Sequence, residues 1–342
     1  MPDSTVTEPT RLAVHIDLDA PGRSLGYVGI IHSDGSSVEY GVVPVPIAVF
    51  NNGDGPTVLL TAGTHGDEYE GQVVLHRLVR TLDIGQVRGS LIVMPALNLP
   101  AVLAEARCSS LDGENLNRAY PGDRNGGPTA QIADFVTRYL LPRCDFAADL
   151  HSGGKSTEFV PCGFMTRMPH GRNSAAQAAA MEAFGMPWTV VYDESTEDRA
   201  LDTACDQNDV VMVSSELGGA GTVTHDILRA AEAGLPRMLA HWGVLDADPT
   251  PTPGTTFLDV NGKDSHVMAH QAGLVEPAVN LGDAVNAGDV VAWLHPATDL
   301  AAAPIPLRAD MSGVIYQRRV PPLVQHGSIV FSIATEITRE EI

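Results

Sequence analysis

Strand-like and helix-like stretches alternate from about residue 56 to residue 245, and this alternation constrains the fold more than any other feature of the chain. Residues 57–63 form a short apolar run rich in β-favouring residues, which predicts a buried strand. Apolar residues then recur at helical spacing and predict a helix over about 67–82. Residues 146–150 are typical of an interior strand, and 223–245 predict a helix that is interrupted at 234–236. We therefore expect an α/β domain with a mostly parallel mixed sheet over residues 46–248.

The segments on either side of this domain have a different pattern. Short β-like runs separated by turns predict an N-terminal β extension over residues 1–45, and residues 249–254 are a Pro-rich linker. Beyond it, short strands predict a C-terminal all-β domain over 255–342. Its intervals 273–288 and 313–327 are nearly equal, which indicates a duplicated unit similar to the barrel-sandwich of lipoyl and biotinyl carriers. Neither half contains a lysine, so covalent attachment of such a cofactor is excluded.

Composition limits the classes of partner. The 342 residues are 44% hydrophobic and 18% charged, which is typical of a globular chain. The formal net charge of −21 argues against nonspecific binding to nucleic acid or to an anionic membrane. The four cysteines form no C-x-x-C motif, and no signal-peptide or membrane-spanning stretch is evident. We expect a cytoplasmic protein with free thiols.

Two histidines and a glutamate fall at predicted strand ends. His65 and Glu68 follow the strand at 57–63, and His151 ends the strand at 146–150. Two histidines, one carboxylate and a water form a tetrahedral catalytic zinc site, and Asp149 is placed to orient one ligand. A hydrogen-bonded structural histidine is the simpler interpretation of any one of these residues. Together they predict one Zn²⁺ per chain and metal-assisted hydrolysis of a carbonyl compound.

Further motifs occur in an order known from one family. They are His65-x-x-Glu68, Asn98-Leu99-Pro100-Ala101, Arg107, the segment 112–122, Asp149-Leu150-His151 and Glu216-Leu217-Gly218. This set resembles the succinylglutamate desuccinylase/aspartoacylase family, relatives of the zinc carboxypeptidases, from about residue 45 to the C-terminus. The resemblance implies a zinc-carboxypeptidase-like domain and deacylation of an N-acyl amino acid. In particular, it implies removal of the acetyl group from N-alpha-acetyl-L-2,4-diaminobutyrate, a step of ectoine degradation.

The resemblance also implies roles for single residues. His65, Glu68 and His151 would hold zinc. Glu216 would be general base toward water and then general acid toward the leaving amine, and Arg107 would polarise the scissile carbonyl.

Other implied roles concern the substrate. Asn117 and Arg118 would bind its carboxylate, and Asn98 is a further candidate for substrate binding. A side-chain ammonium needs an acidic or aromatic partner. The acidic segment 192–198 is one candidate for it, although a solvated charge run explains the same residues.

Three alternatives remain open at this point. The substrate could be another N-acyl amino acid, such as an N-succinyl compound, which would call for a second basic cluster. Peptide hydrolysis is a further alternative, as is a noncatalytic zinc-binding protein. We expect a small-molecule N-acyl amino acid as substrate, no nucleic-acid or membrane partner, and a homo-oligomer, with a dimer as the first choice.

Overall fold

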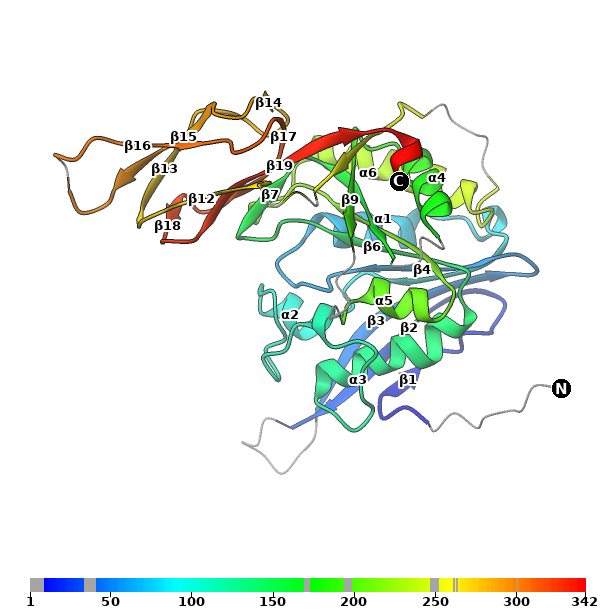
Figure 1. Ribbon diagram of the computed structural model, residues 1–342. Helices are drawn as coiled ribbons and strands as arrows, with labels where there is room; N and C mark the ends of the chain where they lie inside the picture. Colours follow the sequence, from blue (N-terminus) through cyan, green and yellow to red (C-terminus); the bar gives the residue numbers. More distant parts are fainter. Residues whose placement is uncertain are drawn as a thin grey trace.

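The computed structural model describes residues 9–33, 41–168, 173–193, 199–246, 252–260, 262, 264–299 and 301–342. Over these residues the chain forms one large mixed sheet with helices on both faces, and a second, four-stranded antiparallel sheet (Figure 1). The α/β class expected from the alternation is therefore confirmed. None of the helices in this described part of the chain combines the length and the apolar character needed to span a bilayer.

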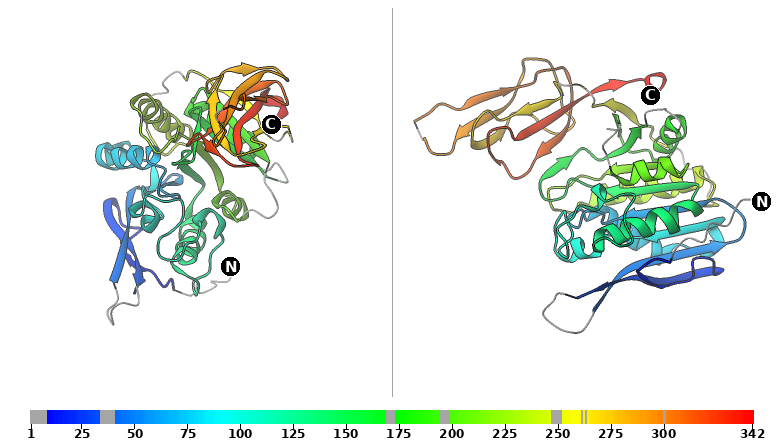
Figure 2. Two further views of the ribbon diagram at one scale, coloured as in Figure 1. Left: turned by 90° about the vertical axis from the view of Figure 1, so that its left-hand side faces the viewer. Right: turned by 60° about the horizontal axis from the view of Figure 1, so that its bottom comes forward.

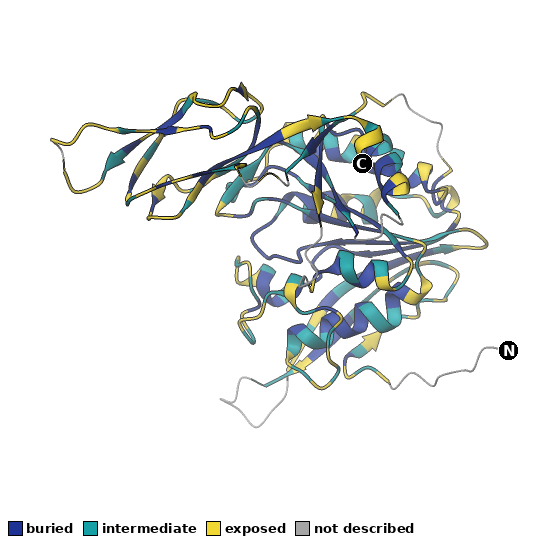
Figure 3. Cartoon of the chain, in the orientation of Figure 1, coloured by how far each residue is buried: buried dark blue, intermediate teal, exposed yellow. Residues whose placement is uncertain are grey.

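Four parallel strands form the centre of the large sheet. They are β5 (Gly89–Met94), β4 (Thr57–Ala62), β6 (Phe146–His151) and β10 (Val211–Glu216), in that spatial order. Strands β4 and β6 are buried over most of their length, as their apolar sequences predict (Figure 3).

Further strands extend the sheet at both edges. Next to β10 come β8 (Cys162–Arg167), β9 (Trp188–Asp193) and β11 (Thr256–Asp259). At the other edge lie β3 (Gly41–Asn52), β2 (Gly22–His32) and β1 (Ala13–His15), all antiparallel. Strands β1 and β2 thus lie at this edge of the sheet. The boundaries drawn between the three predicted regions remain a prediction, because the strands of all three join one sheet.

Helices cover the two faces of the central strands (Figure 2). On one face pack α1 (Glu70–Thr81), α4 (Ser174–Phe184) and α6 (His225–His241), and on the other α3 (Pro128–Phe135) and α5 (Leu201–Gln207). Strand β4 shows the alternation that separates the two cores. Val58 and Leu60 belong to the core under α1, α4 and α6, whereas Leu59 belongs to the core under α3 and α5.

Shorter elements complete the loops of the α/β part. They are α2 (Leu99–Leu103), single 3-10 turns at Ile84–Gln86, Leu116–Arg118, Leu141–Arg143 and Arg339–Glu341, and a π turn at Val136–Leu140.

Two helix predictions need correction. Helix α1 begins at Glu70, not near residue 67, because residues 63–69 form the turn that carries His65 and Glu68. The predicted interruption at 234–236 is wrong, since α6 continues through Pro236. A Cβ atom on Gly234 would lie 2.5 Å from the carbonyl oxygen of Phe184, so glycine is needed for close packing of α6 on α4. Packing of the apolar face of α6 outweighs the local cost of both residues.

The C-terminal residues form two layers of short strands that project from the body of the molecule (Figure 1). The small sheet contains β16 (Ile305–Arg308), β15 (Val290–Pro296), β13 (Gly273–Pro277) and β18 (Leu323–Val324). The C-terminal strands that join the large sheet are β12 (His266–Met268), β14 (Ala284–Val285), β17 (Gly313–Arg319) and β19 (Ile329–Ile337), and β7 (Thr157–Phe159) of the body pairs with β17.

The pairing of these strands is reciprocal between the two predicted halves. β13 of the first half pairs with β18 of the second, and β14 of the first half pairs with β17 of the second. A duplicated unit would produce such a pattern. The layer also joins the body directly, because β19 pairs with β11 and β17 pairs with β7.

Candidate active site

Three neighbouring parallel strands end at the same edge of the sheet and bring the predicted site residues together. His151 is the last residue of β6 and lies in register with Glu216, the last residue of β10. His65 and Glu68 lie in the turn after β4, which is the other neighbour of β6. The carboxyl ends of parallel strands are where such sheets place their ligand sites.

The turn after β4 depends on one glycine. A Cβ atom on Gly66 would lie 2.0 Å from the carbonyl carbon and oxygen of Ala101, so any side chain would displace α2. The Gly66 amide donates to the Ala106 carbonyl at 2.9 Å, which fixes the turn against the following loop. This packing sets the positions from which His65 and Glu68 enter the site.

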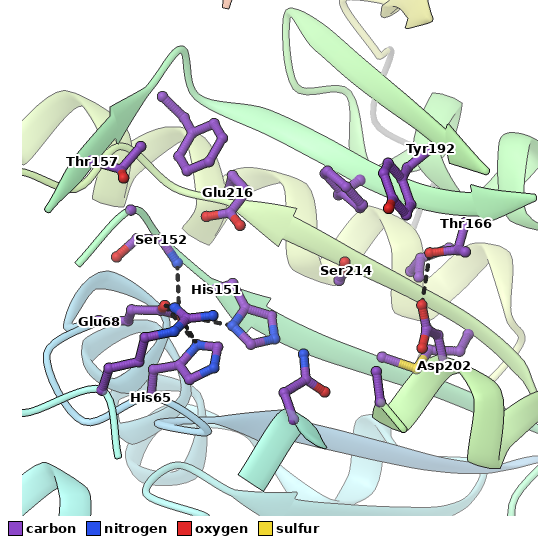
Figure 4. A pocket seen from close by; sticks show the side chains of 18 of the residues that line it. His65, Glu68, His151, Ser152, Thr157, Thr166, Tyr192, Asp202, Ser214 and Glu216 are labelled. Atoms are coloured by element: carbon purple, nitrogen blue, oxygen red, sulfur yellow. Dashed lines mark hydrogen bonds and ion pairs between the residues drawn. The ribbon is translucent and has the colours of Figure 1, made fainter. Parts of the chain in front are cut away.

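The two imidazoles and the carboxylate converge closely (Figure 4). His65 Nδ1 lies 2.7 Å from Glu68 Oε1, and His151 Nδ1 lies 2.7 Å from Glu68 Oε2. One ligand atom from each of the three residues lies within 4.8 Å of the others. The set could therefore hold one metal ion.

The surroundings of the two rings fit a metal better than a purely structural cluster. His65 Nε2 lies 3.1 Å from Asn115 Oδ1, and His151 Nε2 lies 2.9 Å from Asp149 Oδ2. Each ring therefore has an acceptor at Nε2, so an Nε2–H tautomer leaves both Nδ1 lone pairs directed toward the carboxylate. Metal-binding histidines are commonly oriented in this way by a hydrogen bond at the other ring nitrogen.

Asp149 is itself held in place. It is fully buried in β6, and the hydroxyls of Thr61 and Thr64 donate to its two oxygens at 2.8 Å each. Burial alone would raise the pKa of Asp149, but His151 and the two hydroxyls lower it below its ordinary value. Burial likewise opposes ionisation of Glu68, yet the charges and hydrogen bonds of His151 and His65 hold its pKa far below the usual range. Both carboxylates are thus kept ionised inside the protein.

Glu216 has the opposite electrostatic environment. Burial, together with the negative charge of Glu68, raises the pKa of Glu216 to about 8. Its Oε2 atom is buried and has no hydrogen-bond partner among the residues that the structure describes. A carboxylate that shares a pocket with a candidate metal set and carries an unpaired oxygen is suited to exchange a proton with a bound molecule.

The three predicted polar residues of the adjoining loop face the same cavity. Arg107, Asn117 and Arg118 all line it. The Arg107 guanidinium lies 3.3 Å from His65 Nδ1 and 3.4 Å from Glu68 Oε1. Arg118 is exposed, so its charge is available to a bound molecule.

Asn98 differs from these residues. It is fully buried, does not line the cavity and donates to the Thr64 carbonyl at 3.3 Å. A side chain without exposed surface cannot touch a substrate, so the structure does not support the expected substrate contact. Asn98 instead supports the backbone next to His65.

The cavity has a volume of about 450 Å³ and extends well beyond the metal set. Its far end holds residues that the sequence did not single out, among them Thr166 and Asp202 (Figure 4). Of the acidic segment 192–198, Tyr192 lines the cavity, whereas Asp193 forms an ion pair with Arg167 at 2.7 Å. Residues 194–198 lie outside the described residues.

Comparison with known proteins decides the family. Residues 54–242 match the model of the succinylglutamate desuccinylase/aspartoacylase catalytic domain. The chain belongs to this family. It is also 36% identical, over 95% of both chains, to the N-alpha-acetyl-L-2,4-diaminobutyric acid deacetylase of Halomonas elongata.

Solved structures of relatives agree over nearly the whole chain. The product-bound ectoine utilization protein EutE (DoeB) of Ruegeria pomeroyi superposes with a TM-score of 0.92 at 37% identity, covering 96% of this chain and 99% of that chain. A succinylglutamate desuccinylase from Silicibacter superposes with a TM-score of 0.91 at 37% identity, covering 96% and 100%. The family and its named members are deacylases, so the protein is an enzyme that hydrolyses amide bonds.

Proposed function

We propose that this enzyme is a zinc-dependent deacetylase that converts N-alpha-acetyl-L-2,4-diaminobutyrate to acetate and L-2,4-diaminobutyrate during ectoine degradation. One observation carries the proposal. The His65–Glu68–His151 set, the Glu216 carboxylate and the arginines of the adjoining loop all line one cavity. The identity to the Halomonas deacetylase over 95% of both chains supports the choice of substrate.

His65, Glu68 and His151 would hold one Zn²⁺ per chain. Bound zinc supplies a Lewis acid that polarises the acyl carbonyl and activates water at neutral pH. Asp149 and Asn115 would keep both rings turned toward the ion through their hydrogen bonds at Nε2.

Glu216 would move the proton. Its carboxylate would accept a proton from the attacking water and deliver it to the leaving α-nitrogen as the amide C–N bond breaks. Burial favours this role, because it raises the pKa of Glu216 toward neutrality, so that the proton taken from water is readily passed on to the amine.

The loop arginines would act on charge in the substrate. Arg107, beside the metal set, would stabilise negative charge that develops on the carbonyl oxygen. Arg118 would bind the α-carboxylate, since a guanidinium offers two parallel donors to it, and Asn117 would assist. Asn98 would act only by supporting the His65 turn.

Two rival functions are less well supported. A substrate with a second carboxylate, such as an N-succinyl amino acid, calls for a further basic cluster. In the described part of the cavity wall, Arg107 and Arg118 are the only arginines and no lysine is present. A noncatalytic zinc-binding function does not explain why a buried oxygen of Glu216 has no hydrogen-bond partner among the described residues.

The finer features of the fold belong to the same proposal. We assign the α/β body to the zinc-carboxypeptidase-like class, and the C-terminal strands to a barrel-sandwich that narrows access to the cavity. A homodimer remains a prediction that light scattering would check.

Release of the acid product tests the proposal: acetate from N-alpha-acetyl-L-2,4-diaminobutyrate and from N-acetylaspartate, and succinate from N-succinylglutamate. Each substrate is offered to zinc-loaded and to chelated protein, with bound metal counted by mass spectrometry. We expect one zinc per chain and zinc-dependent turnover of the first substrate. Preferred turnover of either other compound would retain the metal chemistry and overturn the substrate.

A further inference from the structure

We infer that Asp202 is the residue that selects a cationic side chain, by binding the side-chain ammonium of the substrate at the end of the cavity opposite the metal set. The inference rests on the proposed function and deepens it. It names the residue that binds the side-chain ammonium, which is remote from the scissile bond.

Asp202 is held so that its carboxylate faces the cavity. It lies in the first turn of α5 and lines the cavity with Thr166 and Tyr192. The Thr166 hydroxyl, from β8, donates to Asp202 Oδ2 at 2.8 Å, and the Thr203 amide donates to Oδ1 at 2.8 Å. Each oxygen thus has one fixed donor, and an ionised carboxylate has acceptor sites left for a ligand.

The start of α5 is also tied to the carboxylate-binding loop. The Leu201 amide donates to Asn117 Oδ1 at 3.1 Å. Asp202 therefore has a fixed position relative to Asn117 and Arg118. Such a link suits a site that must hold the α-carboxylate and the side-chain ammonium of one molecule at once.

The charge of Asp202 has no cationic partner among the residues that the structure describes. Within the described ranges no lysine, arginine or histidine forms an ion pair with it. The nearby Arg199 donates instead to the Tyr120 carbonyl at 3.0 Å. A half-buried carboxylate that faces a cavity without a counter-charge favours a cationic ligand.

The two ends of the cavity are lined by different groups. Figure 4 shows Asp202, Thr166 and Tyr192 on one side and His65 and Glu68 on the other, with Ser214 between them. Tyr192, which lines the same end of the cavity, adds an aromatic ring, and such a ring also attracts an ammonium. A substrate with an anionic side chain would meet repulsion here, so the same residue rejects acylated aspartate and glutamate.

Asp193, the other acid of this region, is a matched control. It is exposed and paired with Arg167, which also pairs with Asp259 at 2.7 Å. Its charge is therefore neutralised within the protein. Asp202→Asn and Asp193→Asn each replace one carboxylate oxygen with an amino group, and we expect a loss of selectivity only from the first.

The test compares two substrates on the zinc-loaded enzyme and its variants. N-alpha-acetyl-L-2,4-diaminobutyrate carries the ammonium, and N-alpha-acetyl-L-norvaline carries a methyl group in the same position. We expect Asp202→Asn to raise KM for the cationic substrate about 10- to 100-fold while changing the norvaline compound less than about 3-fold. Asp193→Asn should leave both substrates unchanged, and Asp202→Glu should restore part of the preference. The ratio of the two kcat/KM values is insensitive to the fraction of folded enzyme.

Each other outcome has a definite meaning. Equal losses on both substrates, or no loss on either, would overturn the role of Asp202 while leaving the deacetylase intact. Absence of turnover of both substrates by the zinc-loaded wild-type enzyme would overturn the proposed function instead. Calorimetric binding of L-2,4-diaminobutyrate needs no turnover, and equal affinity for wild type and Asp202→Asn would also contradict the inference.

Discussion

At one end of the cavity, His65, Glu68 and His151 are held by buried partners, whereas at the other end Asp202 is half buried and held by one hydroxyl and one backbone amide. The metal end draws its residues from the turn after β4 and from adjacent ends of parallel strands. The far end combines β8, β9 and α5, which all lie within residues 162–207. The difference teaches that the reacting groups lie at the ends of the central parallel strands, whereas recognition depends on the outer strands β8 and β9 and on α5.

Removing a metal ligand should have the largest effect and should destroy only the reacting end. We expect His151→Ala to lose bound zinc and to lower kcat/KM at least about 10³-fold. Metal content by mass spectrometry and acetate release check this. Asp202→Asn is the control at the other end and should keep its zinc. Loss of zinc from the Asp202→Asn protein would show that the two ends of the cavity are not independent.

Glu216→Gln should separate chemistry from metal binding. The amide keeps the size of the side chain but cannot accept the proton of water, so kcat should fall about 10²–10⁴-fold with zinc retained. Single-turnover acetate release on zinc-loaded protein measures it. A variant with full activity would remove Glu216 from the mechanism.

Asp149→Asn should test the support beneath the metal end. Asp149 accepts hydrogen bonds from His151 and from two threonine hydroxyls. An asparagine has one acceptor oxygen and can keep only some of these bonds. We expect zinc affinity to fall about 10- to 100-fold. Competition with a chromophoric chelator gives the affinity, and Thr166→Val, at the far end, should leave it unchanged.

Among these variants, Arg118→Lys should have the smallest effect on activity, and that effect should be the same for both substrates. A lysine keeps the charge but loses bidentate contact with the α-carboxylate, so KM should rise about 10-fold. Because cationic and norvaline substrates share that carboxylate, both should lose equally, in contrast to Asp202→Asn. If Arg118→Lys lowered activity on the cationic substrate alone, Arg118 would also contribute to recognition of the ammonium.

The sequence predicted the metal end because its residues are recognisable locally. His65 and Glu68 follow an apolar strand, and His151 ends another, so the alternation that predicts the sheet also predicts where these side chains meet. The family prediction is confirmed by the match over residues 54–242. The roles of the individual residues stay predictions until the variants are made.

The far end could not be predicted in the same way. Asp202 lies in the first turn of a short helix, where an aspartate is ordinarily explained by its favourable interaction with the helix dipole. Its position in the cavity depends on how α5 packs against β10 and on the hydrogen bond from the Thr166 hydroxyl, neither of which local spacing reveals. The charge run at 192–198 was the more visible candidate, yet its first aspartate is paired with Arg167. Pro236 shows a similar limit, since packing keeps α6 intact where local preference predicts a break.

The pairing of β7 with β17 has a consequence for the synthesis of the enzyme. Thr157 and Phe159 of β7 line the cavity, and β7 is held by β17 and through it by β19, at residues 329–337. Chains emerge from the ribosome N-terminus first, and pairings across such separations form late. The metal ligands, all encoded before residue 152, are therefore made long before the wall above them can close. In a nascent chain the three metal ligands are already present while the cavity wall still lacks β17 and β19, the strands that hold β7 in place.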